Sequence, residues 1–280
     1  MTRLTNSDIR DISASLSVYD AELKAATGSS MLGIAAHAWG MDETMLSERL
    51  RALTVRVIPV SGGQGIITDF SRTVAAILNF LGCDARVAEH PDVWGLASAY
   101  DTGADAVFMA DDHRFVGIHL NTRVVADNSE ATGRVFAAAL DLMAGGIKNR
   151  PALVLGCGPV GEAGARALAG AGAKTMLYDI NPEASQALKA LLDRENAGAP
   201  VEVLAALPEG PQEASYILEA TPSGQSIPDG LATAGVYVAA PGVPLGISSH
   251  AADRMGPRLV HDKLELGVAA MAADLVADKP

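Results

Sequence analysis

Val154-Leu155-Gly156-Cys157-Gly158-Pro159-Val160-Gly161 is the stretch that decides the fold of this chain. An apolar run enters the pattern Gly-x-Gly-x-x-Gly, and the residues after Pro159 have the spacing of a helix. A second apolar run follows and ends at Asp179. A strand, a glycine-rich turn, a helix and a second strand that ends in an acidic residue are typical of a dinucleotide-binding βαβ unit.

Each residue of this turn has a physical reason in such a site. Gly156 permits a tight strand-to-helix turn, Gly158 lets the backbone approach a pyrophosphate, and Gly161 brings the helix close to the strand. Pro159 fits the first helical turn, where its missing N–H costs little. A helix N-terminus offers N–H groups and a partial positive charge to phosphates, so we expect all three glycines, Pro159 and Val160 to bind the cofactor. The alternative is a tight turn that binds nothing.

Asp179 bears on which dinucleotide is bound. Its carboxylate can accept hydrogen bonds from both hydroxyls of the adenosine ribose, and it would repel a 2′-phosphate. The following residues, Ile180-Asn181-Pro182, provide no basic side chain to compensate. The sequence therefore predicts NAD rather than NADP.

Two later loops each close an apolar run. They are Glu219-Ala220-Thr221-Pro222 and Ala239-Ala240-Pro241-Gly242-Val243-Pro244. Ligands of doubly wound sheets lie beyond the carboxyl ends of the strands, so we expect Thr221, Pro222 and Pro241 to flank the nicotinamide end. The alternative is that these are ordinary loop residues.

Length, charge and cysteine usage restrict the class of protein. The chain has 280 residues, which suggests two domains, and its net charge of −12 argues against nucleic-acid binding. Cys83 and Cys157 lie too far apart for a disulfide framework or a zinc site, and the histidines have no metal-ligand spacing. No signal peptide and no apolar run long enough to span a membrane is present. We expect a cytoplasmic protein that binds no metal.

The order of elements predicts two α/β domains. Residues 1–147 are expected to form a small substrate-binding α/β domain, and residues 148–280 a Rossmann-type doubly wound domain. The final helix, 264–276, is apolar on most faces. It is expected to pack against the first domain or a partner subunit, which leaves a homodimer open. The expected strands are 55–60, 85–88, 106–110, 152–155, 175–178, 201–204, 216–219, 236–239 and 259–260, and the main helices 43–53, 70–81 and 133–143.

The first domain holds polar residues at two strand ends. Ser61-Gly62-Gly63-Gln64-Gly65 follows the first strand and can expose N–H groups to a carboxylate. Met109-Ala110-Asp111-Asp112 ends a later strand, where an aspartate can pair with an ammonium group. Asp111 has a simpler alternative, which is to cap a turn.

At this point the ordered set of motifs resembles the pyrrolysine synthase family. Pro59 to Ile67, Met109-Ala110-Asp111-Asp112, the turn at Gly156 and the two later loops occur in the same order over nearly the whole chain. The resemblance implies an NAD-dependent oxidation of 3-methyl-D-ornithyl-N6-L-lysine. The terminal amine becomes an imine and is released as ammonia, and the resulting aldehyde condenses with the nearby α-amine to close a pyrroline ring. Among the residues of the sequence, none stands out as a general base.

The resemblance also implies a set of substrate contacts. These are Leu4, Thr5, Ser61, Ile67, Phe70, Asp111 and Asn128. Leu4 and Thr5 can equally start a helix, because Thr5 and Asp8 have the spacing of a capping box, and Phe70 can be a core residue. The chain departs from the family pattern at Gly62 and Gln64, where serine and asparagine are expected, and at Pro159, where a lysine is usual.

Two other functions remain open from the residues alone. One is another two-domain dehydrogenase, similar to methylenetetrahydrofolate or shikimate dehydrogenases, which rely on a lysine in the first domain. Lys24 is the only lysine before Lys148, and it falls on the predicted N-terminal helix that Gly28 ends, away from the strand ends. This placement argues against these dehydrogenases. The other is a non-catalytic NAD-sensing protein, against which the polar residues of the first domain argue.

Overall fold

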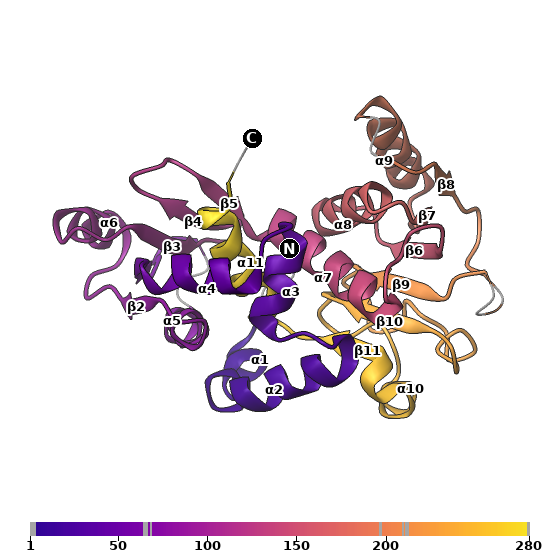
Figure 1. Ribbon diagram of the computed structural model, residues 1–280, viewed down its shortest axis with the longest axis horizontal. Coiled ribbons are helices and arrows are strands. Elements are labelled where there is room, and N and C mark those ends of the chain that lie inside the picture. The colour runs from indigo at the N-terminus through magenta and orange to yellow at the C-terminus, as the bar shows by residue number, and fades with distance from the viewer. Residues whose placement is uncertain are drawn as a thin grey trace. The chain divides into compact units, whose positions relative to one another are not determined.

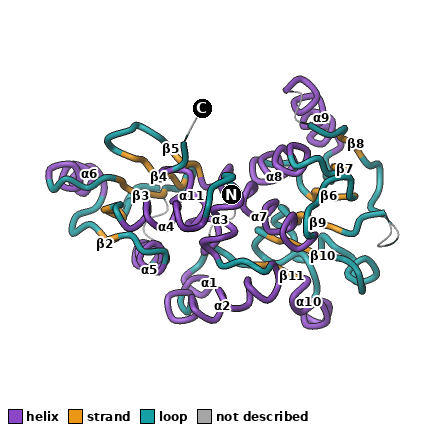
Figure 2. The backbone as a smooth tube through the Cα atoms, viewed as in Figure 1, coloured by secondary structure: helices purple, strands orange, loops and turns teal. Residues whose placement is uncertain are grey.

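The computed structural model describes residues 4–63, 67, 69–195, 198–208, 210 and 213–278 of the chain. They form two compact units (Figure 1). The first unit comprises Met1–Asp20, Met31–Ala131 and Lys263–Pro280, and the second comprises Ala21–Ser30 and Thr132–Asp262. Each unit has its own β-sheet with helices, which confirms the predicted α/β class (Figure 2).

The sheet of the first unit has five strands in the order β2-β1-β3-β4-β5. These are β1 (Thr54–Ile58), β2 (Asp84–Val87), β3 (Ala106–Ala110), β4 (Phe115–His119) and β5 (Val125–Asp127). β1 is parallel to β2 and β3, whereas β4 and β5 extend the sheet antiparallel. Because β1 and β3 are parallel neighbours, the loops after Ile58 and Ala110 leave the sheet at the same edge.

The last helix of the chain belongs to the core of the first unit. The helices of this unit are α1 (Asn6–Ile9), α3 (Met31–Ala38), α4 (Glu43–Arg51), α5 (Phe70–Phe80), α6 (Asp92–Asp101) and α11 (Glu265–Val276). Every residue of α11 from Leu266 to Ala273 is buried, and the helix contacts α3, α4, α5, β4 and β5. A helix that is buried on all sides is apolar all round, which explains the sequence of this segment.

Two helices pass from one unit to the other. They are α2 (Ile12–Thr27) and α7 (Asn128–Ala144). The glycines that break α7 predict a boundary near Lys148, whereas the compact units divide between Ala131 and Thr132. The glycines mark the end of the helix, and a change of unit inside a continuous helix has no signal in composition.

The second unit has a six-stranded parallel sheet in the order β11-β10-β9-β6-β7-β8. Its strands are β6 (Pro151–Leu155), β7 (Lys174–Tyr178), β8 (Val201–Val203), β9 (Tyr216–Glu219), β10 (Tyr237–Ala240) and β11 (Leu259–His261). Its remaining helices are α8 (Pro159–Gly170), α9 (Pro182–Glu195), α10 (Ser249–Met255) and the 3₁₀ turn η1 (Gly256–Arg258). This strand order is that of the doubly wound dinucleotide-binding sheet, which confirms the predicted Rossmann-type fold.

Four elements of the first unit, α3, α6, β4 and β5, were not predicted. The α3 segment is apolar almost throughout, so it lacks the alternation of faces that indicates a helix. In α6 the apolar side chains of Val93, Trp94 and Tyr100 are exposed. An amphipathic helix is predicted from apolar residues that face the core, so this segment gives the wrong signal. The short strands β4 and β5 depend on pairing with β3 and with each other.

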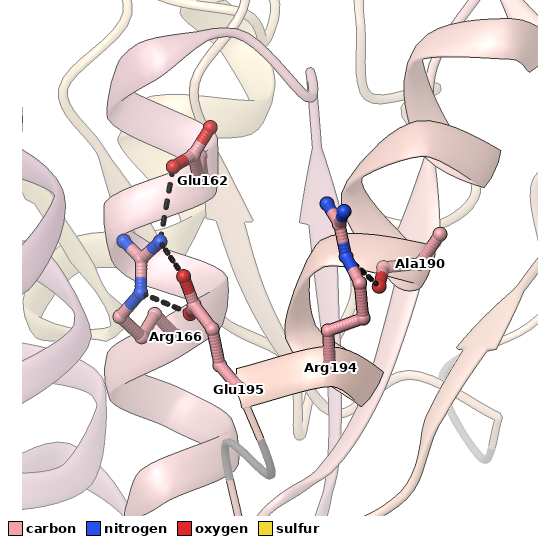
Figure 3. Close-up of polar contacts among 5 residues, drawn as sticks. All are labelled: Glu162, Arg166, Ala190, Arg194 and Glu195. Carbon is pink, nitrogen blue, oxygen red and sulfur yellow. Dashed lines mark hydrogen bonds and ion pairs between the residues drawn. The ribbon is translucent and has the colours of Figure 1, made fainter.

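Figure 3 shows the polar contacts between α8 and α9. The Arg166 guanidinium lies 2.8 and 3.2 Å from the two carboxylate oxygens of Glu195 and 3.0 Å from Glu162 (Figure 3). This bidentate ion pair joins α8, the helix after β6, to the end of α9, the helix after β7.

Asp8 joins the first helix to the segment before α11 within the first unit. Its carboxylate lies 2.8 Å from the Lys263 Nζ, and it accepts the N–H (2.8 Å) and hydroxyl (2.7 Å) of Thr5. Lys263 first, and then Thr5, lower the pKa of Asp8 to about 2. A depressed folded-state pKa adds stability above the unfolded-state pKa of about 3.9, and this stability is lost as the pH falls towards the folded value.

Replacing Asp8 with asparagine should therefore lower the free energy of unfolding at pH 7 by about 1–2 kcal/mol. The difference between wild type and variant should shrink as the pH is lowered from 5 to about 2. Urea unfolding at several pH values measures both. Asp11→Asn is the matched control, since it removes an exposed carboxylate close in sequence to Asp8 and leaves the contact between Asp8 and Lys263 in place. A pH-independent difference for Asp8→Asn would contradict the ion pair as the cause.

Candidate functional site

The turn after β6 has the shape of a phosphate cradle. Gly156 has φ of +88°, and a Cβ built there would lie 2.7 Å from the carbonyl oxygen of Ala220. A Cβ on Gly161 would collide with the carbonyl oxygen of Gly156. A Cβ on Gly158 meets no described atom within 4 Å, so the backbone is open there. Gly158 caps α8 and Pro159 is its first residue, so the helix N-terminus faces the open position, as a pyrophosphate requires.

Asp179 is fixed across this turn. One carboxylate oxygen accepts the N–H of Cys157 at 2.8 Å, and the other accepts the N–H of Asn181 at 2.8 Å. Each oxygen keeps a lone pair that can accept from a ribose hydroxyl. The residues present therefore fit an adenosine dinucleotide, and the acidic side chain also braces the loop that would receive the phosphates.

Cys157 has no features of a nucleophile. Burial first, and the neighbouring Asp179 carboxylate second, raise the pKa of its thiol to about 12. The thiolate is the reactive form of cysteine, so this side chain stays protonated and inert at neutral pH.

Four strand ends come together at one edge of the second sheet. The neighbouring strands β10, β9, β6 and β7 end next to Pro241, Thr221, Gly156 and Asp179, respectively. The N–H of Ala220 donates to the carbonyl of Leu155 at 2.8 Å, so the loop after β9 is tied to the glycine-rich turn. The predicted cofactor residues of the second unit thus share the edge at which such sheets bind ligands.

Glu219 lies inside this edge, a placement that sequence reasoning missed. Its side chain is fully buried and accepts from the N–H (2.9 Å) and hydroxyl (2.5 Å) of Thr221 and from the hydroxyl of Ser226 (2.9 Å). The available signal was a carboxylate that closes the otherwise apolar strand β9.

In the first unit, Ser61 is held by Asp92. The Asp92 carboxylate accepts the Ser61 N–H at 2.8 Å and also the Ser61 hydroxyl in a short hydrogen bond. These two bonds lower the pKa of Asp92. Asp92 has φ of +54°, a left-handed conformation that is uncommon for a residue with a side chain. The Ser61 N–H is therefore engaged by Asp92, and its hydroxyl oxygen can still accept from a substrate ammonium or N–H group.

Asp111 and Asp112 follow β3, at the edge of the first sheet where the loop with Ser61 also lies, and they have different contacts. One Asp111 oxygen accepts the N–H groups of His113 and Arg114, both at 2.7 Å, and these bonds lower its pKa, Arg114 contributing most. Asp111 thus caps the turn between β3 and β4 and has its second oxygen left for a ligand. Asp112 lies against the glycine-rich loop, because a Cβ on Gly63 would fall on its carboxylate.

The other predicted substrate residues also lie in the first unit. Thr5 caps α1, and its polar groups bond to Asp8, as described above. Phe70 begins α5, is half-buried, and packs edge-on against Phe115 with ring centroids 5.3 Å apart. Leu4, Ile67 and Asn128 are half-buried. Gln64, Gly65 and Ile66 of the glycine-rich loop lie outside the described residues.

Membrane-spanning helices and metal-binding clusters are both absent from the described residues. No helix there has the length and apolar character that crossing a membrane requires. No group of three or more His, Cys, Asp and Glu side chains there is arranged to hold a metal ion.

Comparison with known proteins places the chain among biosynthetic enzymes and dehydrogenase folds. Residues 8–126 match the family described as the N-terminal domain of pyrrolysine biosynthesis protein PylD. The pyrrolysine synthase of Methanosarcina acetivorans is 31% identical over 273 residues, which cover 97% of this chain and 98% of that protein.

Solved structures of dehydrogenases share the fold. Quinate dehydrogenase from Corynebacterium glutamicum, in complex with NAD, aligns with a TM-score of 0.51 and 17% identity over 79% of this chain and 93% of that one. A shikimate dehydrogenase in complex with NADP⁺ aligns with a TM-score of 0.53 and 14% identity over 79% and 87%, respectively. At these identities the likeness concerns the fold alone.

Proposed function

Because the chain belongs to the pyrrolysine synthase family, we propose that it oxidises the terminal amine of 3-methyl-D-ornithyl-N6-L-lysine with NAD and releases L-pyrrolysine. The observation that carries this proposal is the match to the family over almost the whole length of both chains. The predicted cofactor residues at the carboxyl edge of the second sheet support it, because an NAD-dependent oxidation needs a dinucleotide site.

The proposed reaction has three balanced steps. The terminal amine carbon loses a hydride and its nitrogen a proton, which gives an imine; NAD, when bound, accepts the hydride. Water adds to the imine and ammonia leaves, which gives an aldehyde. The α-amine of the same ornithine moiety attacks the aldehyde and water leaves, which closes the five-membered ring. Proximity strongly favours such a closure, so the protein has little to add to the last step.

Residues of both units have assigned tasks in this proposal. Gly158 and the N-terminus of α8 receive the pyrophosphate, and Asp179 receives the adenosine ribose. NAD is preferred over NADP because Asp179 would repel a 2′-phosphate and Ile180-Asn181-Pro182 supply no positive charge. Thr221, Pro222 and Pro241 flank the nicotinamide end.

The substrate is assigned to the first unit. Ser61 accepts a hydrogen bond from an ammonium or N–H group of the substrate. The free oxygen of Asp111 binds an α-ammonium group of the substrate. Leu4, Thr5, Ile67, Phe70 and Asn128 complete the proposed contacts, as the family resemblance implies.

One assay tests the proposed function. Purified protein is mixed with NAD and methylornithyl-lysine, NADH is followed by absorbance, and the product mass is measured. Formation of NADH together with pyrrolysine is the expected result. Parallel reactions with shikimate, quinate and methylenetetrahydrofolate test the other dehydrogenase classes that share this fold, and turnover of one of these alone would overturn the proposal.

Replacing Asp111 with asparagine should raise the KM for methylornithyl-lysine about tenfold, because the neutral side chain loses its attraction for an ammonium group. Asparagine can still accept the N–H groups of His113 and Arg114, so the turn and the melting temperature should be unchanged. Steady-state kinetics and a thermal melt measure the two effects. The matched variant Asp112→Asn asks which carboxylate binds the cation. An unchanged KM in Asp111→Asn would remove Asp111 from the substrate site.

A further inference from the structure

The carboxyl group of Glu219 has an asymmetric environment at the end of β9. One oxygen accepts all three hydrogen bonds described above, two from Thr221 and one from Ser226. The other oxygen is buried and has no hydrogen-bond partner among the described residues. The side chain therefore links two positions of the following loop through a single oxygen atom.

Two glycines of the next loop are packed against the same carboxyl group. A Cβ on Gly246 would lie 2.6 Å from Cδ of Glu219, and a Cβ on Gly242 would collide with the unpartnered oxygen. The N–H of Gly242 donates to the carbonyl of Glu219 at 3.3 Å. Neither loop can thus shift without disturbing Glu219, which lies between the loops after β9 and β10.

This arrangement is costly for folding. Burial raises the pKa of Glu219, an effect that the donors Thr221 and Ser226, and the nearby His261, offset only in part. A buried oxygen without a partner adds a desolvation cost. A leucine would fill similar space without either penalty. Residues that violate the local rules of packing in this way are concentrated at functional sites.

We propose that Glu219 is a positioning residue for the dinucleotide. Glu219 joins the loops after β9 and β10, so that the nicotinamide end binds to loops that are already in place. The side chain has no exposed surface, so it acts through Thr221 and Gly242 and does not touch the cofactor. This inference rests on the proposed function only in taking that edge as the cofactor site.

The test compares three variants by NADH titration without substrate. Glu219→Gln retains an oxygen that accepts from Thr221 and Ser226, so its NADH affinity should stay within about threefold of wild type. Glu219→Leu removes that acceptor, and NADH affinity should fall at least about tenfold. Val238→Ala is the matched control, because Val238 is buried in β10 of the same sheet and its truncation should lower the melting temperature with NADH affinity retained.

The pH dependence of stability gives a second readout. A raised folded-state pKa means that Glu219 stabilises the fold most at low pH and that this contribution is lost as the pH rises through the folded pKa. Glutamine has no proton to lose. The melting temperature of Glu219→Gln relative to wild type should therefore be higher at pH 8 than at pH 4.

The outcomes separate this inference from the proposed function. Normal NADH binding by Glu219→Leu, or an equal loss in Val238→Ala at a similar melting temperature, overturns the positioning role. If Glu219→Leu does not fold, Ser226→Ala removes one donor alone, and unchanged NADH affinity in that variant likewise overturns it. If wild type forms pyrrolysine while Glu219→Leu binds NADH normally, only this inference fails. A wild-type protein that binds neither NADH nor NADPH overturns both.

Discussion

Replacing Asp179 with alanine should weaken the binding of NADH about 100-fold. In the proposed complex this carboxylate accepts from two ribose hydroxyls, and charge-assisted hydrogen bonds of this kind are among the strongest in proteins. The Cys157 N–H would also lose its acceptor, which lies 2.8 Å away. The turn that receives the pyrophosphate would then be less well ordered. Titration of NADH fluorescence with both proteins measures the loss.

The comparison with NADPH makes this prediction specific. The alanine variant should lose much less affinity for NADPH than for NADH, because removing the carboxylate also removes its repulsion of the 2′-phosphate. Asp193→Ala is the matched control, since Asp193 also belongs to the second unit but lies on α9 and pairs with Lys189. An equal loss for NADH and NADPH would show that Asp179 acts only by bracing the turn. No loss for NADH would remove it from the cofactor site.

Replacing Asp92 with alanine should raise the KM for methylornithyl-lysine about 30-fold and leave NADH affinity unchanged. Asp92 accepts both the N–H and the hydroxyl of Ser61, so its loss frees the Ser61 side chain to rotate away from the substrate. Steady-state kinetics and an NADH titration measure the two quantities. The split between them matters, because a general loss of structure would change both.

The variant Asp92→Gly separates the effect of losing the carboxylate from the effect of backbone strain at this position. Glycine adopts the left-handed conformation of Asp92, φ +54°, without steric cost, so this variant should be at least as thermally stable as Asp92→Ala. Its KM should be raised to the same extent, since it also lacks the carboxylate. Recovery of the wild-type KM in the glycine variant would show that Ser61 does not depend on Asp92.

The most local parts of the structure could be predicted from the sequence. The strand, turn and helix that begin at Val154 depend on neighbours within about ten residues, so the pattern that specifies them is contiguous. Strands β3 and β9 occur at the predicted residues, 106–110 and 216–219. The family resemblance is confirmed by a relative that is 31% identical over 97% of this chain.

Contacts between distant residues could not be predicted in this way. Asp92 lies 31 residues from Ser61 in sequence. No local pattern indicates that its carboxylate accepts hydrogen bonds from the N–H and hydroxyl of Ser61. The contacts of Asp111, by contrast, are local: the turn-capping role that the sequence left open is confirmed, since one of its oxygens accepts the N–H groups of His113 and Arg114.

The Rossmann-type fold could be predicted from periodicity and glycine placement, and the family from the order of its motifs along the chain. Which polar groups already have partners depends on the fold: Ser61 is paired with Asp92, and the N–H of Cys157 with Asp179. The physical reason is that a hydrogen bond depends on distance and direction in space, and the fold sets both by bringing separate strand ends to one edge.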